Sequence, residues 1–270
     1  MKILFTSDLD RTLIYSNHMM SLYPTNRSKT AVERKADVET SWMCDETMEL
    51  LKEVREKTLF VPVTTRARHQ YERIHFIQEL HQLVAVTSNG GTILENGKPD
   101  LVWAKQLRKS IEDSSVPDEQ MLQIMNDIKY ANWMERSLYI DDLFYVNHVH
   151  LENVQPVALQ QLKEELHELG WHVLLQKKKL YMIPNVLTKE AAVTYIKNKY
   201  SFDFHFAAGD SILDYNMLAM ADISYTPLHG DMKDKEPKKL TQTHYSNENG
   251  TAFTKELLHD VLEHVNRVTL

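Results

Sequence analysis

The stretch KILFTSDLD (residues 2–10) decides how the rest of the chain is interpreted. Its first six residues form a short, mostly apolar segment that favours β-structure, and two acids, Asp8 and Asp10, follow. An apolar run of this kind is typical of a strand buried on both faces of a sheet. The two carboxylates then lie at the carboxyl end of the strand, which is the edge of an open α/β sheet where ligands bind.

Outward from this strand, apolar runs alternate with amphipathic segments. Residues 15–44 are polar and mixed, and we interpret them as a hairpin or flap with short strands in TAVER (30–34) and VETSW (38–42). After the flap we expect a helix, a strand, a helix and a strand, over residues 45–57, 59–63, 68–80 and 83–91. This order predicts a parallel sheet covered by helices on both faces.

The middle of the chain has a different character. We expect two helices and a set of strands there, over residues 118–130 and 156–169, and 137–151, 171–176 and 179–184. The α/β alternation resumes after Thr188 with segments 189–200, 204–210, 212–221 and 223–227, and an amphipathic helix over 251–268. We therefore predict a Rossmann-like α/β core of residues 1–103 and 185–270, with an inserted α+β cap domain over residues 104–184.

Composition limits the classes of function. The 270 residues are 43% apolar and 26% charged, as in an ordinary soluble globule, and no stretch approaches the length of a membrane span. The start of the chain reaches acids too soon for a signal peptide, and the single cysteine, Cys44, suggests a reducing compartment. We therefore expect a cytoplasmic protein. For its oligomeric state we expect a monomer or a homodimer. A net charge of −7 gives no support to a nucleic-acid partner. An anionic substrate would need a local cation such as a metal ion.

Three expected strands end in polar groups. The first is followed by Asp8, Asp10 and Thr12, the second by Thr64 and Arg66, and a later one by Asp210 and Asp214. These groups converge if their strands are neighbours in one sheet. Crowded carboxylates repel one another, and a divalent cation removes that penalty. Oxygen ligands without cysteine or clustered histidine favour Mg²⁺ over zinc.

These segments resemble the haloacid dehalogenase-like (HAD) phosphohydrolases. DLDRT (8–12) resembles the D-x-D-x-T motif of that superfamily, VPVTTR (61–66) its second motif, Lys189 its third, and GDSILD (209–214) its fourth, G-D-x-x-x-D. An insertion between the second and third motifs is where the type II cap of this superfamily sits. SNGGTILENGK, KLYMIPNVLTKE and SNENGTA resemble the capped subgroup that includes sugar-phosphate phosphatases. DLDRTLIYS and FVPVTTRARHQY further resemble HAD hydrolases linked to tellurium-resistance gene clusters.

The resemblance implies roles for the acids. Asp8 would attack phosphorus and form an aspartyl-phosphate. Asp10 would protonate the leaving alkoxide and then activate water, and its backbone carbonyl would bind Mg²⁺. Together with Asp8 and Asp10, Asp210 would bind the metal, and Asp214 would hold Lys189 or a metal-bound water.

It also implies contacts to the phosphate. Thr64 would hydrogen-bond the phosphoryl group, and Lys189 would neutralise it and orient Asp8. The remaining candidates for phosphate or substrate binding are Thr12, Thr65, Arg66 and Asn89.

The chain departs from the family pattern at two positions. Thr65 stands where glycine is frequent, and Leu213 where asparagine is frequent, so Ser211 or Asn216 would supply the polar contact. We expect a Mg²⁺-dependent phosphatase of a small phosphorylated metabolite such as a sugar phosphate. A phosphomutase of the same superfamily, or a non-catalytic ligand-binding or stress-response protein, remain alternatives. A zinc pair at His148 and His150 is disfavoured because no further ligands are evident.

Overall fold

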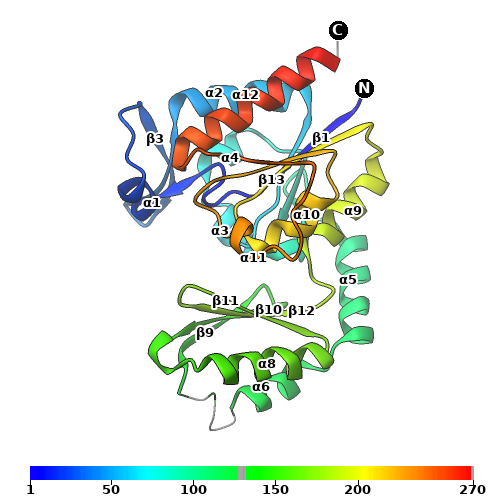
Figure 1. The fold of residues 1–270 in the computed structure, drawn as a ribbon. Helices are drawn as coiled ribbons and strands as arrows, with labels where there is room; N and C mark the ends of the chain where they lie inside the picture. The colour runs from blue at the N-terminus through cyan, green and yellow to red at the C-terminus, as the bar shows by residue number, and fades with distance from the viewer. Residues whose placement is uncertain (127–129, 131, 269–270) are drawn as a thin grey trace. The chain divides into compact units, whose positions relative to one another are not determined.

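The computed structural model describes residues 1–126, 130 and 132–268. The chain forms two compact units, one of residues 1–100 and 189–270 and the other of residues 101–188 (Figure 1). Each unit has its own sheet and its own buried core.

A five-stranded parallel sheet is the centre of the first unit. Its strand order is β15-β14-β13-β1-β5, and every neighbouring pair is parallel. The strands are β1 (Ile3–Ser7), β5 (Leu59–Pro62), β13 (Phe204–Ala208), β14 (Ile223–Thr226) and β15 (Thr243–Tyr245). All five residues of β1 are buried, as expected for a central strand. The predicted Rossmann-like α/β core is therefore confirmed.

Helices flank this sheet on both faces (Figure 1). On one face α2 and α12 pack together, and on the other α9 and α10 are neighbours. They span Asp45–Lys57, Gly250–Val268, Lys189–Tyr200 and Tyr215–Ala219, respectively. The predicted apolar stripe of α12 is confirmed, because Phe253, Leu257, Val261 and Val265 are all fully buried. The segment 212–221 begins with a 3₁₀ turn, η3 (Ile212–Asp214), before α10.

The third expected strand belongs to a different sheet. β6 (Val84–Thr87) pairs antiparallel with β7 (Thr92–Glu95), and β7 pairs with β8 (Lys98–Pro99). A single parallel bridge, Val63 to Val86, joins this sheet to the end of β5. The strand expected within residues 83–91 is confirmed at Val84–Thr87 and is parallel to the end of β5 at that bridge. It ends where the turn η1 (Ser88–Gly90) reverses the chain into β7.

The helix expected over residues 68–80 is divided into α3 (Arg68–Tyr71) and α4 (His75–Glu79). Between them, Ile74 has non-helical backbone (φ −80°, ψ 84°) and forms an antiparallel bridge with Glu33 of the flap. A long-range backbone contact therefore interrupts a segment whose local sequence favours a helix.

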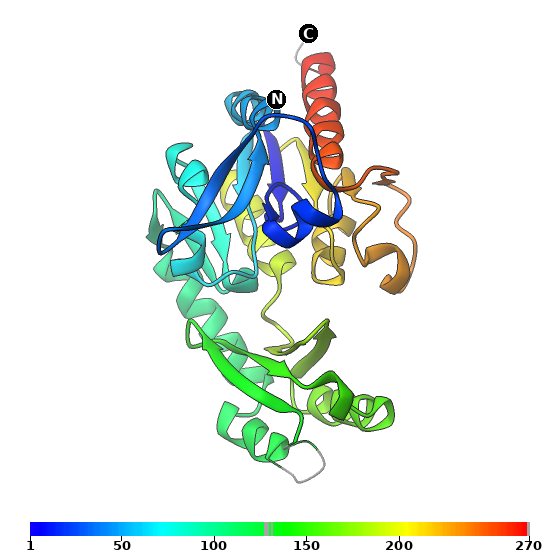
Figure 2. The same cartoon turned by 90° about the vertical axis from the view of Figure 1, so that its left-hand side faces the viewer.

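The flap contains the predicted hairpin. β3 (Lys29–Lys35) pairs with β4 (Val38–Cys44), and β2 (Tyr15–Ser16) pairs with β4 on the other side (Figure 2). A short helix that we did not predict, α1 (Asn17–Leu22), follows β2 and is capped by the Ser16 side chain. Cys44, the last residue of β4, is a buried free thiol, as expected.

The second unit is a four-stranded antiparallel sheet with helices. The strand order is β11-β12-β10-β9, over Trp171–Gln176, Lys179–Pro184, Phe144–Val149 and Met134–Ile140. The helices are α5 (Leu101–Ser114), α6 (Asp118–Met125) and α8 (Pro156–Glu168), and η2 (Leu151–Asn153) is a 3₁₀ turn. The α+β prediction for this region is confirmed. We did not predict α5, and the helix expected to reach residue 130 ends at Met125, while residues 127–129 lie outside the described part.

A short helix, α11 (Met232–Lys235), lies in the charged segment after β14. In the described part of the chain, no helix is long and apolar enough to cross a membrane.

Candidate active site

The carboxyl ends of three adjacent strands bring distant segments together. β1 lies between β13 and β5, and its parallel register continues past its end, because the Asp8 amide donates to the Ala208 carbonyl at 2.9 Å and the Val63 amide to the Ser7 carbonyl at 2.8 Å. Asp8 therefore lies beside the residues that follow β13 and β5. The expected convergence at one edge of the sheet is present.

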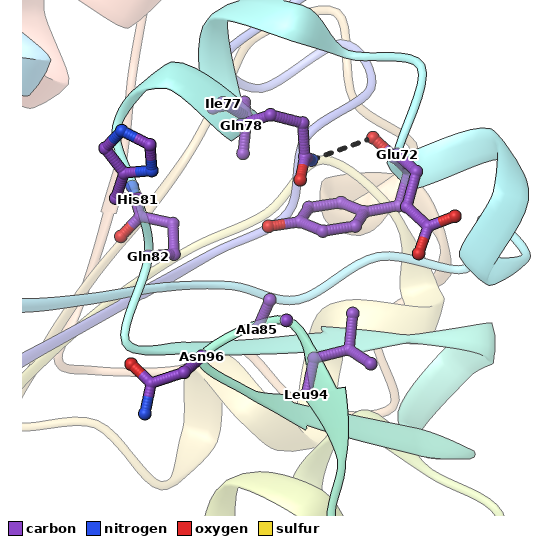
Figure 3. Close-up of a pocket in the computed structure, with 10 residues that line it drawn as sticks. Glu72, Ile77, Gln78, His81, Gln82, Ala85, Leu94 and Asn96 are labelled. Atoms are coloured by element: carbon purple, nitrogen blue, oxygen red, sulfur yellow. Dashed lines mark hydrogen bonds between the residues drawn. The ribbon is translucent and has the colours of Figure 1, made fainter.

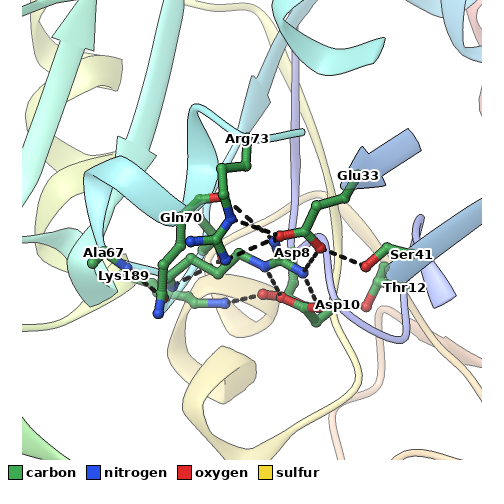
Figure 4. A network of polar contacts seen from close by, with 11 residues as sticks. Asp8, Asp10, Thr12, Glu33, Ser41, Ala67, Gln70, Arg73 and Lys189 are labelled. Carbon is green, nitrogen blue, oxygen red and sulfur yellow. Dashed lines mark hydrogen bonds and ion pairs between the residues drawn. The ribbon is translucent and has the colours of Figure 1, made fainter. Parts of the chain in front are cut away.

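Lys189 connects two of the predicted acids. Its Nζ lies 2.6 Å from Asp8 Oδ1 and 2.6 Å from Asp214 Oδ1, and its side chain is only 1% exposed. Lys189 is the first residue of α9, which holds it close to the strand ends (Figure 4). A buried ammonium with two carboxylate partners is a fixed positive charge next to Asp8.

Ser211 holds the other oxygen of Asp214. Its backbone amide and hydroxyl donate to Asp214 Oδ2 at 2.9 and 3.1 Å. Ser211 thus makes the polar contact that Leu213 cannot. The loop also passes close to Gly209, where a Cβ would lie 2.4 Å from Asp214 Cβ. Only glycine leaves room for this arrangement.

Asp8, Asp210 and Asp214 form the acidic group of the site. One oxygen from each lies within 4.8 Å of the others, and all three residues are buried. Burial raises the pKa of Asp8 to about 7, with the charges of Asp214 and Asp10 adding to the rise and Lys189 opposing it. Burial likewise raises the pKa of Asp210, although Arg11 Nη1 lies 3.1 Å from its Oδ2. Oxygen donors in a buried, electron-rich group fit a hard divalent cation such as Mg²⁺.

Asp10 points to Arg66 and not to this acidic group. Arg66 Nε donates to Asp10 Oδ2 at 2.6 Å and Arg66 Nη2 to Asp10 Oδ1 at 2.8 Å, a bidentate pair. The same guanidinium contacts Glu33, which lies in β3 of the flap and is 3% exposed (Figure 4). We did not predict Glu33 as a site residue, because in sequence it looks like any acid in a polar hairpin.

The remaining candidates lie on the same edge of the sheet. Thr12 Oγ1 is 3.5 Å from Asp8 Oδ2 and is fully buried. Thr64 is also fully buried, and its Oγ1 accepts a hydrogen bond from the Arg66 amide at 3.1 Å. The Asn89 amide donates to the Thr64 carbonyl at 3.0 Å, and Thr65 is half-buried beside Thr64.

Two other features do not join this site. His148 Nε2 lies 3.4 Å from Arg136 Nη2. In the described ranges the group of side chains that could hold a metal ion is the three aspartates, so the structure gives no support to a zinc pair at His148 and His150. A separate pocket of about 270 Å³ lies in the first unit between α3, α4 and the β6–β7 hairpin (Figure 3). Tyr71, Gln78 and Leu94 are among its lining residues, and none of the acids above is.

Comparisons with known proteins agree with this arrangement. The model of the sucrose-6F-phosphate phosphohydrolase family matches residues 1–249. No curated protein sequence matches the chain. The tellurium-linked resemblance finds no counterpart in these comparisons and stays a prediction.

Among solved structures, the sucrose-phosphatase from Synechocystis sp. PCC6803, determined with sucrose and phosphate, is similar with a TM-score of 0.70 and 14% identity, over 98% of this chain and 99% of that one. The HAD subclass IIB sugar phosphatase BT4131 has a TM-score of 0.63 and 11% identity, over 98% and 99%. The trehalose-6-phosphate phosphatase of Aspergillus fumigatus has a TM-score of 0.56 and 14% identity, over 98% and 93%. At these identities the likeness is one of fold.

Proposed function

Because the chain belongs to the sucrose-6F-phosphate phosphohydrolase family of HAD-like phosphatases, we propose that it hydrolyses the phosphomonoester of a small phosphorylated sugar, with Asp8 as nucleophile and Mg²⁺ as cofactor. The observation that carries the proposal is the buried Lys189 bridge between Asp8 and Asp214 at the end of β1. A structural ion pair rarely places its lysine between two fully buried carboxylates at a ligand-binding edge.

The geometry supports a division of labour between Asp8 and Lys189. Lys189 occupies Asp8 Oδ1, so Oδ2 is the oxygen left to attack phosphorus, with only the long contact from Thr12. The ammonium also offers positive charge to the phosphoryl oxygens, on which charge accumulates in the transition state. The product of the attack is an aspartyl-phosphate, which water then hydrolyses.

Asp10 is suited to move the proton. Its carboxylate is 44% exposed, so it can reach a leaving oxygen, while the Arg66 fork fixes its orientation. It would donate a proton to the leaving alkoxide of the sugar and take one from the attacking water in the second step. Thr64, which is fully buried and accepts from the Arg66 amide, would donate its hydroxyl to the phosphoryl group.

The donor set fits a magnesium ion. Asp8 and Asp210 would hold it, together with the backbone carbonyl of Asp10, and Asp214 lies within reach of the same group. The ion would supply positive charge that offsets the developing charge of the phosphoryl group. Arg11 partly balances Asp210 in the structure, and its guanidinium is anchored by the His229 carbonyl at 2.6 Å.

The test is phosphate release from sucrose 6-phosphate, trehalose 6-phosphate, glucose 6-phosphate, a nucleotide and an aryl phosphate. Each substrate is offered to the wild-type chain with Mg²⁺, with a chelator, and to the Asp8→Asn variant. We expect release that requires Mg²⁺, favours a sugar phosphate and falls at least about a thousandfold in the variant. Formation of an isomeric phosphate ester without free phosphate would indicate a mutase instead. No turnover of any substrate would refute the proposal.

A further inference from the structure

All three nitrogens of the Arg66 guanidinium lie within 3.5 Å of protein oxygens. Nε and one N–H of Nη2 donate to Asp10, at 2.6 and 2.8 Å. The other N–H of Nη2 donates to Glu33 Oε2 at 3.1 Å, and Nη1 contacts Glu33 Oε1 at 2.9 Å and the Gln70 carbonyl at 3.5 Å. Arg66 thus has two carboxylate partners on its two edges. This geometry makes Arg66 a clamp for Asp10, because all three guanidinium nitrogens contact protein oxygens.

Glu33 is the second carboxylate that contacts Arg66, and it is buried. Its side chain is 4% exposed, and it also accepts from Ser41 Oγ at 2.7 Å and contacts Arg73 at 3.2 Å. Burial works to raise the pKa of Glu33, but the hydrogen bonds and charge of Arg66 outweigh it and lower the pKa below its usual value. A buried carboxylate is tolerated only when its partners compensate for lost solvation, and Glu33 has that full complement.

The cluster contains two acidic and two basic side chains. Asp10, Glu33, Arg66 and Arg73 are joined in one chain of contacts (Figure 4). A backbone contact also holds this cluster in place, because Glu33 forms an antiparallel bridge with Ile74, the residue immediately after Arg73. The flap hairpin is therefore tied to the second motif at the point where that motif contacts Asp10.

We propose that Glu33 is a positioning residue for the phosphatase reaction, acting through Arg66 to hold the Asp10 carboxylate in the orientation needed for proton transfer. The inference rests on the proposed function and deepens it, since it assigns the flap hairpin β3–β4 a part in the active site. Glu33 does not contact Asp10 directly. Loss of the Glu33 carboxylate leaves Arg66 with Asp10 as its single carboxylate partner. The guanidinium of Arg66 and the Asp10 carboxylate bound to it can then move together.

The expected effect depends on the leaving group. The value of kcat/KM reports the steps up to formation of the phosphoenzyme, including departure of the alcohol. A sugar alkoxide is strongly basic and needs a proton from Asp10, whereas p-nitrophenolate is a weak base and leaves without one. A displacement of about 1 Å in a reacting group costs on the order of a hundredfold. Loss of Glu33 should therefore weaken hydrolysis of a sugar phosphate selectively.

The experiment compares Glu33→Gln and Glu33→Ala with Glu39→Gln. Glu39 is a matched control because it lies in the same hairpin and pairs with Arg34 at 3.0 Å, but both partners are exposed. Phosphate release is measured with the best sugar phosphate of the panel above and with p-nitrophenyl phosphate. Thermal unfolding of each variant shows that it is folded, and Glu33→Gln, which keeps the shape of the side chain, serves if the alanine variant does not fold.

We expect kcat/KM for the sugar phosphate to fall about 10- to 100-fold in the Glu33 variants, and that for p-nitrophenyl phosphate by less than about threefold. The Glu39 variant should match the wild type with both substrates. Equal losses on both substrates would mean that Glu33 is only structural, and no loss on either would mean that Arg66 holds Asp10 unaided. Each of these outcomes overturns the inference while the wild-type activity stands. A wild-type chain that hydrolyses none of the phosphates overturns the proposed function, and the inference with it.

Discussion

Replacing Lys189 with methionine should destabilise the chain far more than the same change at Lys199. Both lysines lie in α9, and each contacts two carboxylates, Lys189 at 2.6 and 2.6 Å and Lys199 at 2.6 and 2.8 Å. They differ in burial, because the side chain of Lys189 is 1% exposed and that of Lys199 is 37% exposed. The pair therefore compares a buried with a half-exposed ammonium at similar contact distances.

The magnitude follows from what each change leaves behind. Without Lys189, Asp8 and Asp214 remain in the interior with no compensating ammonium, and removing one partner of a buried pair costs about 3–5 kcal/mol. Without Lys199, water can solvate Glu95, whereas Asp100, whose side chain is 4% exposed, keeps the hydrogen bond from the Tyr195 hydroxyl at 3.0 Å. The cost is then about 1 kcal/mol. The expected difference of about 3 kcal/mol corresponds to roughly 6–12 °C in melting temperature for a chain of this size.

The assay is thermal unfolding of both variants in a chelating buffer at pH 7.5, so that no divalent cation takes the place of the lost ammonium. Denaturant titrations at 25 °C give the free energies directly. The reasoning would be refuted if the Lys189 variant lost no more stability than the Lys199 variant, since the buried carboxylates would then not need their cation.

Three further predictions concern the site and the sheet that carries it. Asp210→Asn should abolish the rise in melting temperature that 10 mM Mg²⁺ produces in the wild type, because a carboxylate ligand is lost. Burial lowers the pKa of His205 to about 3, so the unfolded chain takes up a proton at this position below pH 6.5 that the native chain does not. From pH 7.5 to 5 the free energy of unfolding of the wild type should therefore fall by about 2 kcal/mol relative to that of His205→Gln, because the other titrating groups, Asp8 among them, contribute equally to both. Gly209→Ala should lower kcat more than about a hundredfold, since its Cβ would displace Asp214, whereas Gly97→Ala, with no atom within 4 Å, should keep full activity at a stability cost of about 1 kcal/mol from its positive φ.

Each of these has a clear contrary result. A Mg²⁺-induced stabilisation that survives in the Asp210 variant would place the ion elsewhere. Identical pH dependence of unfolding in wild type and the His205 variant would mean that His205 is protonated in the folded chain. Equal activity of the two glycine variants would show that the loop yields to a methyl group beside Asp214.

The sequence by itself determined the parallel core and the convergence of its polar ends. The runs that form β1, β5 and β13 are mostly apolar, as strands buried on both faces require. The polar residues that follow these parallel strands therefore lie at one edge of the sheet. Asp8, Lys189 and Asp214 were chosen from these positions and from a family resemblance. In the structure, Lys189 Nζ lies 2.6 Å from one oxygen of each aspartate.

The tertiary structure alone decided what Arg66 faces and what the flap does. Glu33 is separated from Arg66 by 33 positions, and its neighbours in sequence are typical of any solvated hairpin. The same contact between flap and second motif divides the helix expected over residues 68–80, because the non-helical backbone at Ile74 forms a bridge with Glu33. Periodicity and capping report only local preferences, whereas a buried ion pair depends on which distant segments pack together. Such contacts have no signal in a single sequence, since desolvation and pairing arise only once the chain has folded.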